Sequence, residues 1–197
     1  YGAEHTGTLS SLSTAEQYLA AFFQSVTLRT AGFNTLPIGS LATGTLLIMI
    51  IFMTIGAAQG STGGGIKINT AAVILAYVGS ILRGKREVLL HRYTISAEYV
   101  QKAFLVLLFA LSMIGLGAIV LSFSEPFAFH RILFETVSAF ATVGLSTGIT
   151  GDLTSLGKAT LVVLMFFGRL GPLTILAAVS RPEKGVEISY PEGEISI

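Results

Sequence analysis

The sequence predicts an all-α, polytopic membrane protein built from membrane-helix–pore-loop–membrane-helix repeats. Hydrophobic residues make up 52% of the 197 residues and charged residues only 12%, about half the share in a typical soluble domain. Three apolar stretches carry at most one charge each and are long enough, as helices, to cross about 30 Å of hydrocarbon. Two regions, one around Thr30 and the other around Thr142, repeat one pattern of glycine, threonine and apolar residues without a gap.

The composition also excludes several classes of protein. So few polar side chains do not cover the water-facing surface of a soluble enzyme. The alternative, buried helices of a large soluble core, requires a chain of this size to solvate three nearly chargeless spans. A net charge of +1 offers no attraction for nucleic acid, and the absence of cysteine removes thiol catalysis and thiolate metal sites.

Two short amphipathic segments are expected to form helices that do not span the membrane. They cover residues 15–28 and 127–141, and about 15 residues fit a re-entrant or interfacial helix. Ser13 or Thr14 is the expected N-cap of the first helix, with Glu16 in its first turn.

The long apolar stretches are expected to cross the membrane. They cover residues 41–59, 103–123 and 161–179, and Arg169 is the one charge in the last of them. Residues 66–82 form a fourth, slightly short stretch. A single helix over residues 41–82 would be about twice as long as the membrane is thick, so it must break.

Basic residues predict the orientation of the loops. They concentrate in residues 83–102 and recur as Arg181 and Lys184 after the last apolar stretch. By the positive-inside rule these two segments are cytoplasmic. The loops at residues 33–40 and 145–158 then face the outside.

The internal repeat joins a short helix, a Thr-x-Gly turn and a long apolar helix. With one residue of slippage, FFQSVT at residues 22–27 also resembles LFETVS at residues 133–138. Such a repeat indicates two copies of a transmembrane unit packed around an axis. The matched positions are Thr30, Gly32, Thr35, Gly39, Leu41, Met53 and Gly56 with Thr142, Gly144, Thr147, Gly151, Leu153, Met165 and Gly168.

The two Thr-x-Gly turns are candidate ion ligands. A turn at mid-depth in the membrane has unpaired backbone groups, so it must be buried in protein or line a wet cavity. Carbonyl oxygens in such turns replace the water shell of a cation. Gly32 and Gly144 lack a Cβ and allow the backbone angles required, while Thr30 and Thr142 add hydroxyl or carbonyl ligands. The spacing favours a cation but does not separate potassium from sodium.

A glycine-rich run at residues 60–67 (GSTGGGIK) marks the break in the apolar stretch. It is read either as a kink at the membrane face or as a flexible loop below the turns that obstructs the pore. It is not a phosphate-binding loop, because its lysine does not directly follow Gly65 and no serine or threonine follows Lys67.

Two charges lie within or beside the apolar stretches. Arg169 is expected either to line the pore, repelling cations or holding the glycine-rich run through its carbonyls, or to extend to the cytoplasmic interface. Lys67 is expected to reach the interface from its helix end. The histidines, His5, His91 and His130, do not cluster and are not expected to bind metal.

Five segments of the chain carry a resemblance to a known family. They are TLRTAGFNTLPIG (27–39), GSTGGGIK (60–67), SAFATVGLSTGIT (138–150), FFGRLGPLT (166–174) and YPEGEISI (190–197). Together these segments resemble the potassium transporters of the Ktr/Trk/HKT superfamily, most of all the bacterial Ktr-type membrane subunit. The resemblance implies four pore repeats around one potassium pathway. Residues 1–93 would be the third repeat without its first membrane helix, and residues 94–197 the fourth repeat with a cytoplasmic tail.

The resemblance also implies partners and site residues. It implies a homodimer in the plasma membrane, a cytosolic nucleotide-binding regulatory ring, and potassium bound through filter backbone only, without an organic cofactor. The constriction-lining charge would be Arg169. The selectivity filter would be Thr30, Ala31, Gly32, Phe33 and Asn34 with Thr142, Val143, Gly144 and Leu145, and the gating loop Gly60, Ser61, Thr62, Gly63, Gly64 and Gly65.

The function expected is passive, gated potassium uptake, not enzymatic catalysis. An ion-coupled secondary transporter of a small solute, built on broken helices, is the alternative, although it has few charges to offer a substrate. An intramembrane protease with Ser61 as nucleophile would need a general base, and no histidine falls in an apolar stretch.

Overall fold

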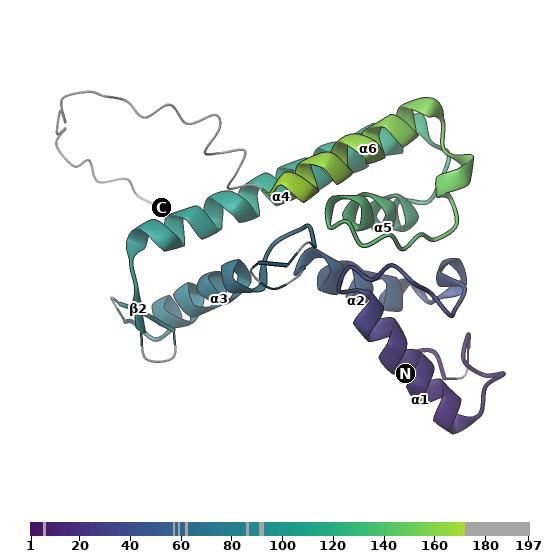
Figure 1. The fold of residues 1–197 in the computed structure, drawn as a ribbon, viewed down its shortest axis with the longest axis horizontal. Helices are drawn as coiled ribbons and strands as arrows, with labels where there is room; N and C mark the ends of the chain where they lie inside the picture. Colours follow the sequence, from purple (N-terminus) through teal and green to yellow (C-terminus); the bar gives the residue numbers. More distant parts are fainter. Residues whose placement is uncertain are drawn as a thin grey trace.

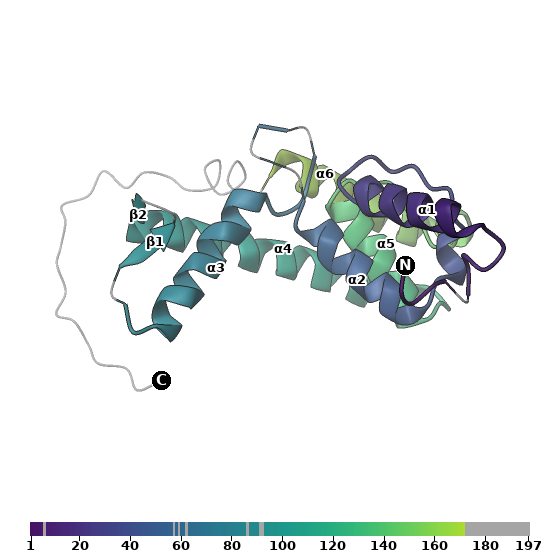
Figure 2. The same ribbon diagram turned by 90° about the horizontal axis from the view of Figure 1, so that it is seen from below.

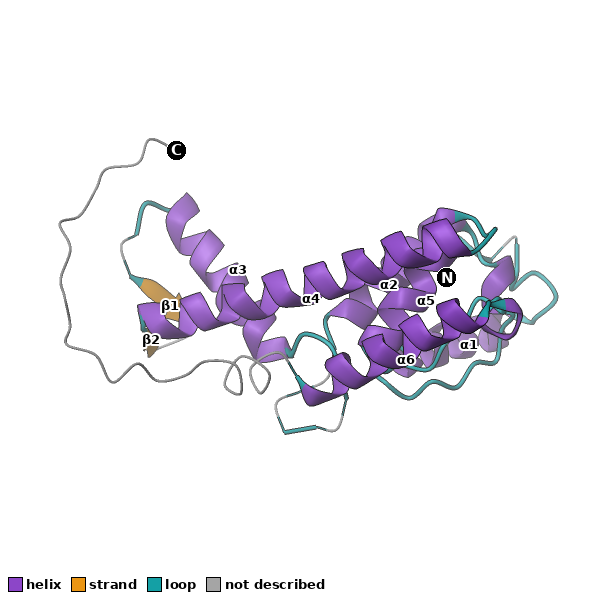
Figure 3. Cartoon of the chain, turned by 90° about the horizontal axis from the view of Figure 1, so that it is seen from above, coloured by secondary structure: helices purple, strands orange, loops and turns teal. Residues whose placement is uncertain are grey.

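The structure is a computed structural model that describes residues 1–5, 7–56, 58, 60–61, 63–85, 87–90 and 93–171. It is mostly helical, with one small hairpin (Figures 1 and 3). In chain order the elements are α1 (Thr14–Thr27), a 3-10 turn (Ile38–Ser40), α2 (Thr43–Thr54), α3 (Ile68–Leu82), β1 (Val88–Leu90), β2 (Tyr93–Ile95), α4 (Ala97–Ser124), α5 (Phe129–Phe140), a 3-10 turn (Thr150–Asp152) and α6 (Ser155–Leu170).

Within the described residues, α4 is the one helix long and apolar enough to cross a membrane. Its 28 residues correspond to about 42 Å of helix and include the whole of the predicted span at residues 103–123. The helices α2 and α3 are apolar but shorter. The short helices predicted at residues 15–28 and 127–141 are found as α1 and α5, and the predicted N-cap Ser13 forms a capping box with Glu16.

The prediction of one continuous helix over residues 41–59 is wrong, because α2 ends at Thr54. The Gly56 N–H donates to the Ile66 carbonyl at 2.7 Å, and the Ile66 N–H donates to the Thr54 carbonyl at 3.1 Å. These two bonds clasp the end of α2 to the start of α3 and close the glycine-rich run into a loop. A Cβ on Gly56 would clash with the Gly64 carbonyl, so the close approach of the two segments requires glycine there.

The structure differs from the sequence-based prediction at two further places, the start of α6 and the hairpin before α4. The helix α6 begins at Ser155, ahead of the predicted span at 161–179, and residues beyond Gly171 lie outside the described part. The hairpin of β1 and β2 was not predicted; it pairs Val88 with Ile95 in an antiparallel register. Such short strands leave too brief an alternation to stand out among the charged residues around them.

The helix α5 lies at the centre of the fold. Figure 1 shows it between α2 on one side and α4 with α6 on the other, and it packs against all three. Its Phe134 and Phe140 are fully buried in a core that also includes Met53 of α2 and Ala110 of α4. The helix α3 and the hairpin lie toward the other end of α4 (Figure 2). The site residues therefore gather around α5.

Candidate cation site

The two Thr-x-Gly turns have the same backbone conformation. Thr30 and Thr142 have φ values of 64° and 53°, and Gly32 and Gly144 have φ values of 76° and 90°. Threonine rarely adopts this left-handed region, because its branched Cβ crowds the backbone there. A rare conformation at both members of the repeat, which lie far apart in the sequence, indicates that the surroundings of each turn hold it in place.

Each turn is tied to the end of the short helix that precedes it. The Thr27 hydroxyl donates to the Phe33 carbonyl at 2.5 Å, and the Ser138 hydroxyl donates to the Leu145 carbonyl at 2.6 Å. Main-chain bonds to the carbonyls of Thr27 and Ser138 close the turns from the other side. The C-terminal ends of α1 and α5, which carry partial negative charge, therefore abut the turns and favour a cation.

Six carbonyl oxygens in these turns are left over for a ligand. The bonds formed by the part of the chain that the structure describes use the carbonyls before and after each turn, but not those within it. The six unused carbonyls belong to Thr30, Ala31, Gly32, Thr142, Val143 and Gly144. Val143 is the one buried residue among these six and the others are half-buried or exposed, so water or a cation can reach the unused carbonyls.

The two turns lie directly against each other. A Cβ on Gly32 would come within 2.5 Å of the Val143 carbonyl oxygen, which is too close for any side chain. A Cβ on Gly144 would lie 3.6 Å from the Gly32 Cα, an ordinary contact. The predicted filter segments, far apart in sequence, are thus brought together by the fold.

The glycine-rich loop contacts the turn at Thr142 directly. The Gly64 N–H donates to the Thr142 hydroxyl at 2.8 Å, and a Cβ on Gly64 would lie 3.0 Å from the Gly168 carbonyl oxygen. Lys67 donates to the carbonyls of Gly63 and Ser61, so this lysine holds the loop. Thr62, predicted as part of the loop, lies outside the described residues.

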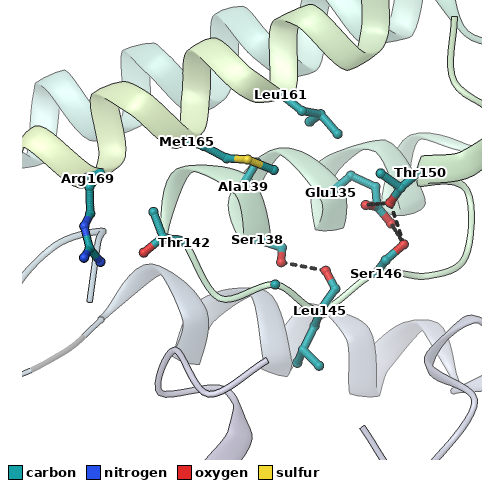
Figure 4. A pocket seen from close by; sticks show the side chains of 11 residues that line it. Glu135, Ser138, Ala139, Thr142, Leu145, Ser146, Thr150, Leu161, Met165 and Arg169 are labelled. Carbon is teal, nitrogen blue, oxygen red and sulfur yellow. Dashed lines mark hydrogen bonds between the residues drawn. The ribbon is translucent and has the colours of Figure 1, made fainter. Parts of the chain in front are cut away.

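A cavity of about 400 Å³ opens between α5 and α6 beside the turn at Thr142. Thr142 and Gly144 line it, with Arg169 at one end and Glu135 at the other (Figure 4). Arg169 is close enough to Lys67 for their charges to interact. A Cβ on Gly168 would clash with the Phe140 carbonyl, so glycine lets α6 approach α5 and brings Arg169 to the cavity.

Two carboxylates that the sequence did not single out hold the outer ends of the helices. Glu4 accepts from the Ala42 N–H at 2.8 Å and the Thr45 hydroxyl at 2.6 Å, at the start of α2. Glu125 accepts from the Thr154 N–H at 3.2 Å and its hydroxyl at 2.5 Å, at the start of α6. Ala42 and Thr154 occupy matching positions of the internal repeat, a correspondence visible in the sequence only once the caps are known.

Hydrogen bonds lower the pKa of both carboxyls. For Glu4, burial alone would raise the pKa, but the bonds from Thr45, Ala42 and Thr8 outweigh it and lower the pKa. For Glu125, the bond from the Thr154 hydroxyl is the largest cause and lowers the pKa despite burial. Both carboxyls are therefore held in the charged form that suits a helix N-terminus.

A match to known proteins agrees with this arrangement. Residues 2–187 match the model of the TrkH family, described as a cation transport protein. The chain belongs to this family. Membership of a family of cation transporters makes the chain part of a membrane transporter rather than an enzyme.

Curated relatives cover nearly the whole chain. The Ktr system potassium uptake protein B of Bacillus subtilis is 43% identical over 96% of this chain and 42% of its own length. The protein of the same name from Vibrio alginolyticus is 42% identical over 95% of this chain and 41% of its own. The potassium/sodium uptake protein NtpJ of Enterococcus hirae is 33% identical over 96% and 43%. The chain therefore spans about two fifths of the length of these relatives.

Proposed function

We propose that the chain supplies the third and fourth pore repeats of a potassium uptake protein. Residues 1–93 form the third repeat from its outer loop onward, and residues 94–197 form the fourth with a cytoplasmic tail. The observation that carries the proposal is the pair of adjoining turns, each with the same rare backbone and with carbonyls that accept no hydrogen bond from a described residue. The names of the curated relatives support potassium as the cargo.

In this proposal the ion loses its water to backbone oxygens of the two turns. Thr30 to Asn34 and Thr142 to Leu145 form half of a selectivity filter, and the remaining half comes from two further repeats. Because two turns contribute only part of an ion's coordination shell, neither unit selects alone. Permeation is passive, and it follows the electrochemical gradient of the ion.

The gate in this proposal is the glycine-rich loop together with two positively charged side chains beside it, Lys67 and Arg169. Lys67 binds the loop carbonyls, and Gly64 binds the Thr142 hydroxyl, so the loop lies directly below the filter. Arg169 adds a positive charge that repels a cation in transit. Residues 60–65 should therefore obstruct the pathway, and shortening this loop should raise the flux without changing which ion is selected.

The assembly follows from the resemblance to Ktr-type subunits. The intact protein is a homodimer in the plasma membrane, regulated by a cytosolic nucleotide-binding ring. The break between α2 and α3 also fits a second candidate, an ion-coupled secondary transporter of a small solute, because broken helices form such binding sites. That transporter would need charged groups aimed at its solute, and the described cavity offers Arg169 and Glu135 alone.

Potassium uptake by a cell that lacks its own uptake systems tests the proposal. The intact transporter containing this chain should restore saturable uptake of potassium or rubidium. Gly144→Ser should weaken that uptake and its preference over sodium, because a side chain at a φ of 90° distorts the turn. The matched control is Gly151→Ser, where nothing lies within 4 Å of an added Cβ. If Gly144→Ser and Gly151→Ser show the same preference for potassium over sodium, the assignment of Gly144 to the selectivity filter is wrong.

A further inference from the structure

The short helices α1 and α5 each bury one long polar side chain, six or seven residues before the threonine of the Thr-x-Gly turn. It is Gln24 in α1 and Glu135 in α5, and they match in the alignment of FFQSVT with LFETVS. Their exposed fractions are 7% and 3%. A buried polar group requires partners, so the two positions invite comparison.

Glu135 has a full set of partners in the segment that follows the fourth-repeat turn. Its Oε1 accepts from the Ser146 hydroxyl at 2.8 Å, the Thr147 N–H at 2.8 Å and the Thr147 hydroxyl at 2.9 Å. Its Oε2 accepts from the Thr150 hydroxyl at 2.7 Å. Figure 4 shows the carboxylate reaching the loop at the outer end of the cavity.

Gln24 has no such partners. Neither its amide nitrogen nor its oxygen bonds to any residue that the structure describes, although both atoms are buried. The residues of the third repeat that correspond to Ser146 and Thr147 are Asn34 and Thr35, and the Asn34 side chain instead donates to the Leu36 carbonyl at 3.2 Å. Ile38, in place of Thr150, has no hydroxyl to donate.

The bonds of Glu135 hold the filter turn from its far side. Ser138, one turn later on the same face of α5, donates to the Leu145 carbonyl, and Glu135 binds Thr147 just beyond it. One face of a buried helix thus fixes the chain on both sides of Ser146. In the third repeat Thr27 provides the first of these anchors and Gln24 does not provide the second.

We infer that Glu135 is the positioning residue of the filter, and that the fourth-repeat turn, which Glu135 fixes, contributes more to cation discrimination than the third-repeat turn. Burial agrees with the role of Glu135, since Glu135 and Leu145 are both 3% exposed. The inference rests on the proposed function. It adds that the two turns contribute unequally and names the side chain responsible.

The test measures the concentrations of potassium and of sodium that half-inhibit rubidium uptake by the intact transporter, at equal amounts of folded protein. The ratio of these two concentrations reports the discrimination between the ions. Glu135→Gln keeps the size of the side chain but replaces one acceptor oxygen with a donor, so it should lower the discrimination about tenfold. Gln24→Leu removes an amide without partners among the described residues and should leave the ratio within about twofold of the parent.

A double-mutant cycle separates positioning from general stability. Thr147→Val removes one donor to Glu135, so it should lower discrimination in the parent but add little in the Glu135→Gln background. If Glu135→Gln does not fold, Thr150→Val, which removes the one donor to Oε2, carries the same expectation in a milder form.

The outcomes distinguish this inference from the function on which it rests. If Glu135→Gln, or Thr150→Val in its place, folds and keeps the parental ratio, the positioning role is refuted while potassium uptake stands. An equal loss in Gln24→Leu would refute the unequal roles of the two turns. Absence of saturable potassium uptake by the parent itself would instead refute the proposed function, and the inference with it.

Discussion

The two turn-bearing units of the chain share a backbone but not an environment. In the unit of α5 and α6, the helix before the turn packs against α2, α4 and α6, and Val143 and Leu145 of its turn are buried. In the unit of α1 and α2, the helix before the turn exposes large apolar side chains, and no described helix covers it as α4 covers α5. These side chains are Tyr18, Leu19, Phe22, Phe23 and Val26.

The comparison teaches which features are local. A hydroxyl near the helix end and a Thr-x-Gly sequence accompany the same turn conformation in both units, so these features are local to each unit. The anchoring of the turn differs, because it depends on residues further away, such as Glu135. The same substitution made at matching positions of the two units should therefore have different effects on stability or transport.

The largest effect is expected at Gly168, where α6 approaches α5. Gly168→Ala would drive a methyl group into the Phe140 carbonyl, so it should lower the free energy of unfolding by about 3 kcal/mol or more. Thermal unfolding of the purified intact transporter measures this. Gly115→Ala on α4 is the control, since nothing lies within 4 Å of its added Cβ. Equal stability of the two variants would show that α6 does not depend on this close approach.

A smaller difference is expected between the two filter glycines. Gly32→Ala and Gly144→Ala both place a side chain at positive φ, at a cost of roughly 1 kcal/mol. Gly32→Ala also meets the Val143 carbonyl, while Gly144→Ala has ordinary contacts. Gly32→Ala should therefore be the less stable of the two in the same unfolding measurement. The reverse order would mean that the turns do not lie against each other as described.

The threonines of the turns should differ by about 1 kcal/mol. Thr30→Gly and Thr142→Gly both relieve a strained backbone angle, but Thr142→Gly also removes the acceptor for the Gly64 N–H. Thr30→Gly should therefore retain more of the stability of the parent than Thr142→Gly. Chemical denaturation of the two variants measures the difference, and equal stabilities would indicate that the loop gains nothing from Thr142.

The smallest effect concerns the outer carboxylates. The pKa values of Glu4 and Glu125 are lowered in the folded protein. Their contribution to stability is therefore present above their ordinary pKa of 4.5 and is lost as the pH falls through the lowered value. Glu4→Gln and Glu125→Gln should each be less stable than the parent at pH 7, and the difference should shrink below about pH 4. A difference that grows on acidification would contradict the capping role.

Sequence reasoning located the elements around the site with useful accuracy. The helices α1 and α5 lie close to their predicted bounds, because their amphipathic patterns end at clear turn residues. The constant offset of the repeat placed Thr30 and Gly32 in correspondence with Thr142 and Gly144, and their φ values agree in pairs. Periodicity and spacing are local, so they are readable without the fold.

The contacts between distant segments were not predictable in the same way. Hydropathy alone predicted that the helix at residues 41–59 continues past Thr54. The hydrogen bonds of Ile66 with Thr54 and Gly56, which accompany the end of the helix, cannot be inferred from the hydropathy of the segment. Glu135 was counted among the charges of the outer loops, although a carboxylate among buried residues, followed by the hydroxyl-rich segment 146–150, is a usable signal. The bond from Gly64 to Thr142 joins residues far apart in the chain and depends on tertiary packing.

The most direct test of the account is to locate the ion itself. Anomalous scattering from crystals of the intact transporter grown in rubidium or thallium salt would place a monovalent cation without reference to transport rates. The account predicts a peak bounded by the carbonyl oxygens of Thr30 to Gly32 and Thr142 to Gly144. A peak elsewhere in the membrane region, with these oxygens bonded only to protein, would contradict it.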